Sequence, residues 1–242
     1  MVLKGDVTDD PNVITTCELN RILCNKHFLS SHMINLRETD QYFIECEYVQ
    51  LSNMSNTALE SVNQNSLLMK TQELHILKSR VSNVFLKNVS KITVGSFKLN
   101  IYTRHVDEDV TFTTIFNFFP HLSLIMIHTA YFGWLTDLSS LGKRLKSIFI
   151  ADDNFERMFS FMPDELYDFV AKQGPQFHLQ LHIKMDNIHQ IDKIKPFIDA
   201  RFQPGKEGDG NFIVSICFVQ SRSEEQFDYV CREQFETEMG KK

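Results

Sequence analysis

The sequence predicts an α/β fold built as an irregular solenoid of strand–helix units, with a more helical N-terminal part. From about residue 110 onward, short apolar strands alternate with helical patterns. The strands start at about residues 122, 146, 177 and 212, so successive starts lie 24, 31 and 35 residues apart. Each interval holds one strand, one loop and one helix, which favours a right-handed coil of parallel strands. The uneven spacing favours an irregular solenoid. An ordinary doubly wound sheet is the alternative.

The N-terminal part is expected to contain a tail, two helices and a strand. Residues 1–12 are polar and acidic, which predicts a mobile tail. Apolar residues recur at helical spacing over 16–36. The β-branched and aromatic residues of 42–51 indicate a strand. Residues 57–60 have the spacing of a capping box and open a helix that extends to Leu68.

The elements after residue 70 are mostly alternating strands and helices. A short strand at 74–77 precedes a hairpin at 91–101, whose alternating runs flank Gly95. The remaining predicted strands are 122–128, 146–151, 177–184 and 212–219, and the predicted helices are 111–119, 134–145, 163–174, 187–202 and 224–238. Pro163 at a helix start and Gly174 past its end are typical helix boundaries.

The chain is expected to form a single α/β unit over residues 13–242, because no linker rich in Pro, Ser or Gly interrupts it. Within this unit, 13–70 is the N-terminal helix-and-strand part and 71–242 holds the strand–helix units. A chain of 242 residues buries about 70% of the surface that it exposes when unfolded. It therefore needs no disulfide or metal to fold.

Composition argues against nucleic-acid and membrane partners. The chain has 25 Lys and Arg against 31 Asp and Glu, a net charge of −6, and its densest basic stretch, 142–146, has three charges. A phosphate-binding groove needs more clustered Lys and Arg. No membrane span of ~20 apolar residues and no signal peptide are expected. The five cysteines are odd in number and form no CxxC pair, which predicts reduced thiols and a cytoplasmic or nuclear location.

No cofactor or metal site is predicted. Four soft ligands gather near the N-terminus, but a six-residue gap between the cysteines is wrong for a zinc knuckle, and we expect buried residues on a core-facing helix. These ligands are Cys17, Cys24, His27 and His32. His178 and His182 lie four apart in a predicted strand, ~13 Å, too far for one ion. The glycine-rich loop 205–210 fits no phosphate-binding motif.

Acidic residues at strand ends provide the enzyme alternative. They are Asp107, Asp109, Asp152 and Asp153. Carboxylates at the carboxyl ends of strands of an open α/β sheet suit a metal-assisted hydrolase. However, Asp109 and Asp153 each precede a predicted helix, so capping is the structural alternative. Because no nucleophile elbow, zinc-protease motif or kinase signature occurs, the sequence predicts a protein that is not an enzyme.

The best candidate site is an aromatic cluster just past the strand at 122–128. It consists of Tyr131, Phe132 and Trp134. Exposed aromatic side chains on a loop are typical anchors for a protein partner. Packing in the core of the next helix is the alternative. The sequence thus favours a non-enzymatic protein-interaction module.

Two segments share the apolar rhythm of degenerate leucine-rich repeats, namely 118–127 (FFPHLSLIMI) and 142–150 (GKRLKSIFI). Over residues 70–220 the chain resembles the leucine-rich-repeat-like C-terminal domains of the F-box-associated families that are expanded in nematodes. The resemblance implies substrate recognition in a ubiquitin ligase and binding to a Skp1-type adaptor. An F-box usually opens with Leu-Pro, and the helix predicted at 16–36 lacks that opening. No functional residue is carried over from the family.

Overall fold

The computed structural model describes residues 2–4, 16–19, 22–24, 27–29, 32–34, 42–61, 67–174, 176–184, 194, 198, 201–204, 214–219 and 224–231. The chain divides into two compact units, Met1–Met126 (unit 1) and Ile127–Lys242 (unit 2). The division falls at residue 126, whereas the sequence pattern suggested a change of character near residue 70. Each unit is an open, mostly parallel mixed sheet with helices, as expected for an α/β fold.

Unit 1 is built on a sheet with the strand order β10-β9-β7-β6-β1-β2-β5, and β8 also pairs with β7. The strands are β1 (Val2–Lys4), β2 (Thr16–Leu19), β5 (His32–Ile34), β6 (Tyr42–Ser52), β7 (Leu67–Leu77), β8 (Thr93–Val94), β9 (Lys98–Tyr102) and β10 (Leu124–Ile127). Strands β1, β6, β7 and β9 run parallel, and β2 is antiparallel to β1 and β5. A separate hairpin pairs β3 (Ile22–Cys24) with β4 (His27–Leu29).

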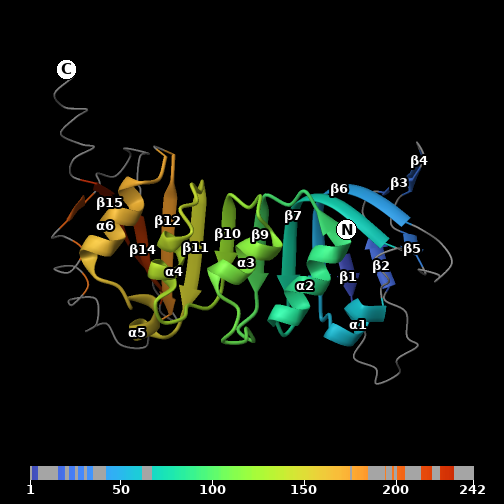
Figure 1. Cartoon of the computed structure of the whole chain (residues 1–242), viewed down its shortest axis with the longest axis horizontal. Coiled ribbons are helices and arrows are strands. Elements are labelled where there is room, and N and C mark those ends of the chain that lie inside the picture. Colours follow the sequence, from blue (N-terminus) through green and yellow to red (C-terminus); the bar gives the residue numbers. More distant parts are fainter. Residues whose placement is uncertain are drawn as a thin grey trace, which may run out of the picture. The chain divides into compact units, whose positions relative to one another are not determined.

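The helices of unit 1 are α1 (Asn56–Ser61), α2 (Asn83–Ile92) and α3 (Phe112–Phe118), and they lie on one side of the sheet (Figure 1). Hydroxyl groups of Ser55, Ser82 and Thr111 cap all three of them. The Ser82 Oγ accepts from the Phe85 backbone N–H, and the Thr111 Oγ1 accepts from the Thr114 N–H. Apolar side chains of α2 and of the inner strand faces are buried. Removing this apolar surface from water is the main stabilising contribution.

Unit 2 has the strand order β13-β15-β14-β12-β11. Its strands are β11 (Ser147–Asp152), β12 (His178–Lys184), β13 (Phe202–Pro204), β14 (Val214–Val219) and β15 (Glu224–Cys231). Strands β11, β12 and β14 run parallel, and β15 is antiparallel to both β14 and β13. Helices α4 (Trp134–Ser140), α5 (Phe155–Met158) and α6 (Pro163–Ala171) lie on one side of the strands (Figure 1).

Strict alternation of side chains separates the two faces of the sheet along β12. In β12, Leu179, Leu181 and Ile183 are buried, whereas His178 and His182 are half-buried. Successive strand residues point to opposite faces, so the apolar set lies on the helix side and the polar set on the other. We call the other side the open face, since none of the described helices covers it.

Several predicted elements are confirmed. The strands at 42–51, 122–128, 146–151, 177–184 and 212–219 correspond to β6, β10, β11, β12 and β14, and the helices at 111–119 and 163–174 correspond to α3 and α6. The helix predicted from 134 ends at Ser140. The strand expected at 74–77 is the last part of the longer β7. Parallel pairing of β11, β12 and β14 matches the pairing inferred from strand spacing.

The prediction of a more helical N-terminal part is wrong for the described residues. The helix expected at 16–36 is replaced by four short strands, β2 to β5. Three- or four-residue strands that follow one another at intervals of two residues return an apolar residue every few positions, which imitates helical spacing. The helix expected from residue 57 is α1, which ends at Ser61, and its first turn is capped by the Ser55 Oγ, which accepts from the Ala58 N–H. Leu67 already belongs to β7.

The hairpin predicted at 91–101 is also wrong. Residues up to Ile92 form the end of α2, and both β8 and β9 pair in parallel with β7. Gly95 does adopt the left-handed conformation, with φ of 79°, but it lies between β8 and β9, which both pair with β7 and not with each other. The parallel partner β7 therefore overrides the local hairpin signal.

The C-terminal helix predicted from Glu224 is a strand, β15, as far as Cys231. Long-range pairing explains the difference, because Phe227 stands opposite Ile216 and Tyr229 opposite Val214 on β14. The helix predicted at 187–202 lies mostly outside the described residues, although Ile194 and Ile198 are helical and buried. The predicted tail and the loop 205–210 lie largely or wholly outside them as well. No helix in the described ranges is long and apolar enough to cross a membrane.

Candidate functional site

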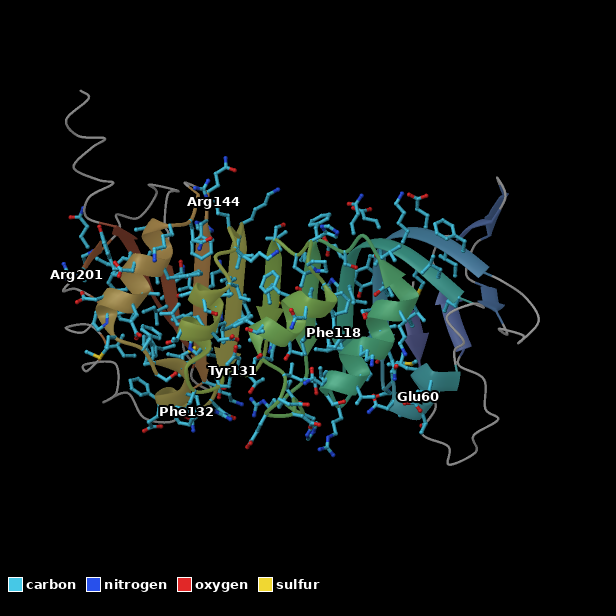
Figure 2. All side chains as sticks on the ribbon, viewed as in Figure 1. Glu60, Phe118, Tyr131, Phe132, Arg144 and Arg201 are labelled. Atoms are coloured by element: carbon cyan, nitrogen blue, oxygen red, sulfur yellow. The ribbon has the colours of Figure 1, made fainter. Side chains whose placement is uncertain are left out.

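The aromatic cluster predicted from the sequence lies at the start of α4 in unit 2. Phe132 is 69% exposed, and Met162, just before α6, is 64% exposed. Their loops are joined by a hydrogen bond from the Gly133 N–H to the Ser160 Oγ at 3.0 Å. We call Tyr131, Phe132 and Met162 the aromatic edge. Figure 2 shows Tyr131 and Phe132 at the same end of the unit. Phe132 and Met162 are thus two exposed large apolar side chains on loops that this hydrogen bond joins.

Trp134 does not belong to that surface, which corrects its assignment as a partner-binding residue. It is fully buried, and its ring meets the Phe161 ring edge-on with centroids 5.5 Å apart. Its indole N–H donates to the Met158 carbonyl oxygen at 3.0 Å. A buried tryptophan needs such an acceptor. Trp134 therefore connects the start of α4 to the end of α5, next to the residues of the aromatic edge.

Tyr131 is half-buried, and its hydroxyl group donates to the Asp137 Oδ2 at 2.5 Å, one turn along α4. Gly133 is the N-cap of α4 with φ of 76°, a conformation that costs other residues about 1–2 kcal/mol. These features fix the loop in one conformation.

Asp152 anchors the same loop from β11. Its buried carboxylate accepts from the Ala130 N–H at 2.5 Å, from the Asn154 N–H at 2.7 Å and from the Arg157 guanidinium at 2.9 Å. The role is structural, because these donors belong to the segment before α4 and to the N-cap and last turn of α5, which Asp152 joins. Asp153 is half-exposed and 3.9 Å from Arg157.

The positions of the acidic residues give no support to the alternative of a metal-assisted hydrolase. Asp107, in unit 1, pairs with Arg80 at 2.8 Å, and this carboxylate raises the pKa of the guanidinium. Asp109 is exposed, and its carbonyl oxygen accepts from Asn83 and Thr114. The capping roles expected for Asp109 and Asp153 are wrong, because Thr111 and Asn154 are the N-caps of α3 and α5.

A second polar cluster occupies the open face of unit 1, and sequence reasoning missed it. We call it the His75 cluster; its members are Tyr48, Gln50, Glu73, His75, Lys98, Asn100 and Tyr102. The His75 ring lies between two tyrosines, with centroids 4.4 Å from Tyr48 and 5.7 Å from Tyr102. Its Nε2 is 3.2 Å from the Glu73 Oε2 and 2.7 Å from the Asn100 Nδ2.

Burial controls the electrostatics of the His75 cluster. It lowers the pKa of His75, and the hydrogen bond and negative charge of Glu73 offset only part of that effect. Burial alone would raise the pKa of Glu73, but hydrogen bonds from Lys98 and His75 outweigh it and hold the pKa below its usual value. The Lys98 Nζ is 3.0 Å from the Glu73 Oε2. His75 is therefore neutral at pH 7, and Glu73 is ionised.

The signal for this cluster was the period-two pattern of Glu73-Leu74-His75 and Lys98-Leu99-Asn100. Both runs place polar residues on one face. The pairing that joins them, Glu73 opposite Lys98 and His75 opposite Asn100, follows from the parallel register of β7 and β9. Because the sequence predicted a hairpin at 91–101, the parallel pairing of β9 with β7 was not expected.

The cysteine and histidine candidates for a metal site lie on strands β2 to β5 and on β12. Cys17, Cys24, His27 and His32 belong to four different short strands, and Cys24 stands opposite His27 in the β3–β4 hairpin. His182 packs against Phe149 on the open face, with ring centroids 4.5 Å apart. Within the part of the chain that the structure describes, no three His, Cys, Asp or Glu side chains gather in a way that could hold an ion.

Comparison of the chain with family models, with curated proteins and with solved structures gives no match. The resemblance to F-box-associated families therefore stays a prediction, and the functional argument depends on the site itself.

Proposed function

We propose that this chain is a non-enzymatic protein-interaction module that binds a protein partner through its aromatic edge. The observation that carries the proposal is the exposure of Phe132, 69%, on a loop that hydrogen bonds hold in place. Exposed aromatic residues in rigid surroundings are the side chains that contribute most to binding energy in protein interfaces.

The proposal also includes a solenoid architecture and a role in a ubiquitin ligase. In each unit, parallel strands and helices on one side are consistent with a degenerate leucine-rich-repeat-like solenoid. Substrate recognition in a ubiquitin ligase, through a Skp1-type adaptor, is the context that the sequence resemblance suggests, together with a cytoplasmic or nuclear location. No observation favours the hydrolase alternative, since Asp107 and Asp152 are engaged with Arg80 and Arg157.

The test is affinity purification of the tagged chain from cells that express it, followed by mass spectrometry. We expect the wild-type chain to recover a reproducible set of proteins and Phe132→Ala to lose it. Val84→Ala is the matched control, because Val84 is also an exposed apolar residue, 51% exposed, but lies on α2 of unit 1.

Each outcome has a defined meaning. Recovery of Skp1 and a cullin with the wild-type chain supports the ligase context, and recovery of other proteins without them excludes it. An unchanged set with Phe132→Ala refutes the role of the aromatic edge. A wild-type sample that recovers nothing above background refutes the interaction function.

A further inference from the structure

We propose that the His75 cluster, on the open face of unit 1, binds a neutral sugar. The sugar site lies on a different unit from the aromatic edge and takes a different class of ligand, so it goes beyond the proposed function. Three observations support it, which are the arrangement of the cluster on the sheet, the hydrogen bonds that its members lack and its charge.

The cluster forms two rows across the parallel strands β6, β7 and β9. In strand order, the first row is Tyr48, Glu73 and Lys98, and the second is Gln50, His75 and Asn100. The rings of Tyr48 and Tyr102 flank His75, and all three side chains are half-buried, so each is partly accessible. The described helices of unit 1 lie on the opposite side of the sheet (Figure 1). A ligand can therefore approach both rows from the same side.

The second row is short of hydrogen-bond partners. Asn100 is 1% exposed, and its Oδ1 accepts no hydrogen bond from the part of the chain that the structure describes. The His75 Nε2 lies 2.7 Å from the Asn100 Nδ2 and 3.2 Å from the Glu73 Oε2. A ring nitrogen of neutral histidine either accepts or donates, so it can serve the amide or the carboxylate but not both. Because buried polar groups are nearly always paired, this row indicates that a further polar group binds here.

A hydroxyl group supplies what the second row lacks, because its one oxygen atom both donates and accepts. It can donate to the Asn100 Oδ1 or the Glu73 Oε2, and it can accept from the Asn100 Nδ2. Several of these needs are met at once by a molecule with adjacent hydroxyl groups, which is the chemistry of a sugar. The tyrosine rings beside His75 suit the C–H surface of a sugar ring, since they combine an apolar face with a polar hydroxyl.

The cluster carries no net charge, which selects among ligands. The Lys98 Nζ and the Glu73 Oε2 pair at 3.0 Å, and His75 is neutral at pH 7 because burial lowers its pKa, so the sum is 1 − 1 = 0. A phosphate or an ammonium group gains no net attraction from such a cluster. A neutral ligand leaves the ion pair intact. The charge therefore favours a neutral sugar over a nucleotide or an amine.

The test uses the full chain and three sugars, cellopentaose, maltopentaose and chitopentaose, which differ in linkage and in their N-acetyl groups. Isothermal titration calorimetry should show that at least one of them binds, with a Kd below about 1 mM. Adenosine monophosphate, the charged comparison, should not bind. Because Asn100 is buried, a sugar reaches its amide only when the His75 side chain turns aside. In NMR spectra of the chain with 13C-labelled histidine, the same sugar should therefore shift the Cε1–H signal of His75, which His75→Asn identifies by its absence.

Variants separate the site from the fold. Asn100→Leu keeps nearly the shape of the side chain and removes its polar groups, so it should abolish sugar binding without lowering the Tm, because an unpaired buried polar group does not stabilise the fold. Tyr102→Ala should raise the Kd about fivefold through the loss of an aromatic contact. His182→Ala is the matched control and should leave the Kd unchanged, since His182 is also a half-buried histidine beside an aromatic ring on the open face, but in unit 2.

Each outcome decides for or against the sugar site. Binding that shifts the His75 signal, is lost in Asn100→Leu and survives in His182→Ala supports it. Failure of all three sugars to bind overturns it, and so does binding of adenosine monophosphate in their place. Binding that Asn100→Leu leaves unchanged, or that shifts no His75 signal, puts the sugar elsewhere and overturns it as well. None of these measurements involves Phe132, so the proposed function stands or fails separately.

Discussion

Replacing Asp152 by Asn tests whether one buried carboxylate holds the aromatic edge together. The change preserves the shape of the side chain and removes its charge. The carboxylate uses both oxygens, Oδ2 for the Ala130 N–H and Oδ1 for the Asn154 N–H and the Arg157 guanidinium. An asparagine has one acceptor oxygen, so one of these two sets of donors loses its acceptor and faces an NH2 group.

The expected loss of stability follows from these contacts. A hydrogen bond to a charged group contributes ~1.5–3 kcal/mol, and leaving a buried donor unsatisfied costs about 1–3 kcal/mol. Removing one partner of a buried ion pair costs ~3–5 kcal/mol. Arg157 is about one-third exposed, so water recovers part of its loss. We expect Asp152→Asn to destabilise the chain by about 3 kcal/mol, which for a chain of this size is a fall in Tm of roughly 6–12 °C.

Trp134 provides the assay, because it is the single tryptophan of the chain and is fully buried beside this loop. Urea unfolding followed by its fluorescence gives the free energy of unfolding. Asp153→Asn is the control, since this half-exposed neighbour lies 3.9 Å from Arg157, beyond hydrogen-bond distance, and should change stability by less than about 0.5 kcal/mol. An Asp152→Asn variant within 0.5 kcal/mol of wild type would refute the reasoning.

Three further predictions concern single residues. Trp134→Phe should destabilise the chain by about 2–3 kcal/mol in thermal unfolding followed by circular dichroism, because the Met158 carbonyl oxygen loses its donor and a cavity forms; an unchanged Tm would contradict this. Gly133→Ala should cost about 1 kcal/mol through backbone strain alone, since nothing lies within 4 Å of the added Cβ, and urea unfolding measures it. His75 has a pKa below its unfolded value near 6.5, so the unfolded chain binds the proton first and stability falls as the pH drops below ~6.5. His75→Asn should flatten the dependence of unfolding free energy on pH between 7 and 5.5, and equal slopes for the variant and wild type would exclude the effect.

The elements that the sequence predicted well are those whose signals are local. Helix α6 has Pro163 at its first position and acidic residues in its first turn, and both act within a few residues. Strand β12 alternates so regularly that its buried and half-buried faces follow from the order of residues alone. Both were predicted almost to the residue.

The elements that were predicted wrongly are those whose structure depends on contacts with residues far away in the sequence. Residues 224–231 have charged and apolar residues in a pattern that fits a helix. They form a strand because they pair with β14 and β13. The same is true of the candidate site. Phe132 and Trp134 are two residues apart and equally aromatic, but one is exposed and the other is buried against Phe161, which lies more than twenty residues away. No local pattern distinguishes them, and the contribution of Met162 had no sequence signal at all.

The position of β15 has a consequence for how the protein is made. This strand lies between β13 and β14, although it follows both in the chain. During synthesis, β14 is complete at Val219, but its partner is complete only at Cys231. At ~5–20 residues per second, adding the residues from Val219 to Cys231 takes about 0.6–2.4 s. Exposed edges of apolar strands pair with other chains. Until β15 docks, the edge of β14 that it covers is therefore open to pairing with another chain, so correct folding of this unit depends on the last strand described.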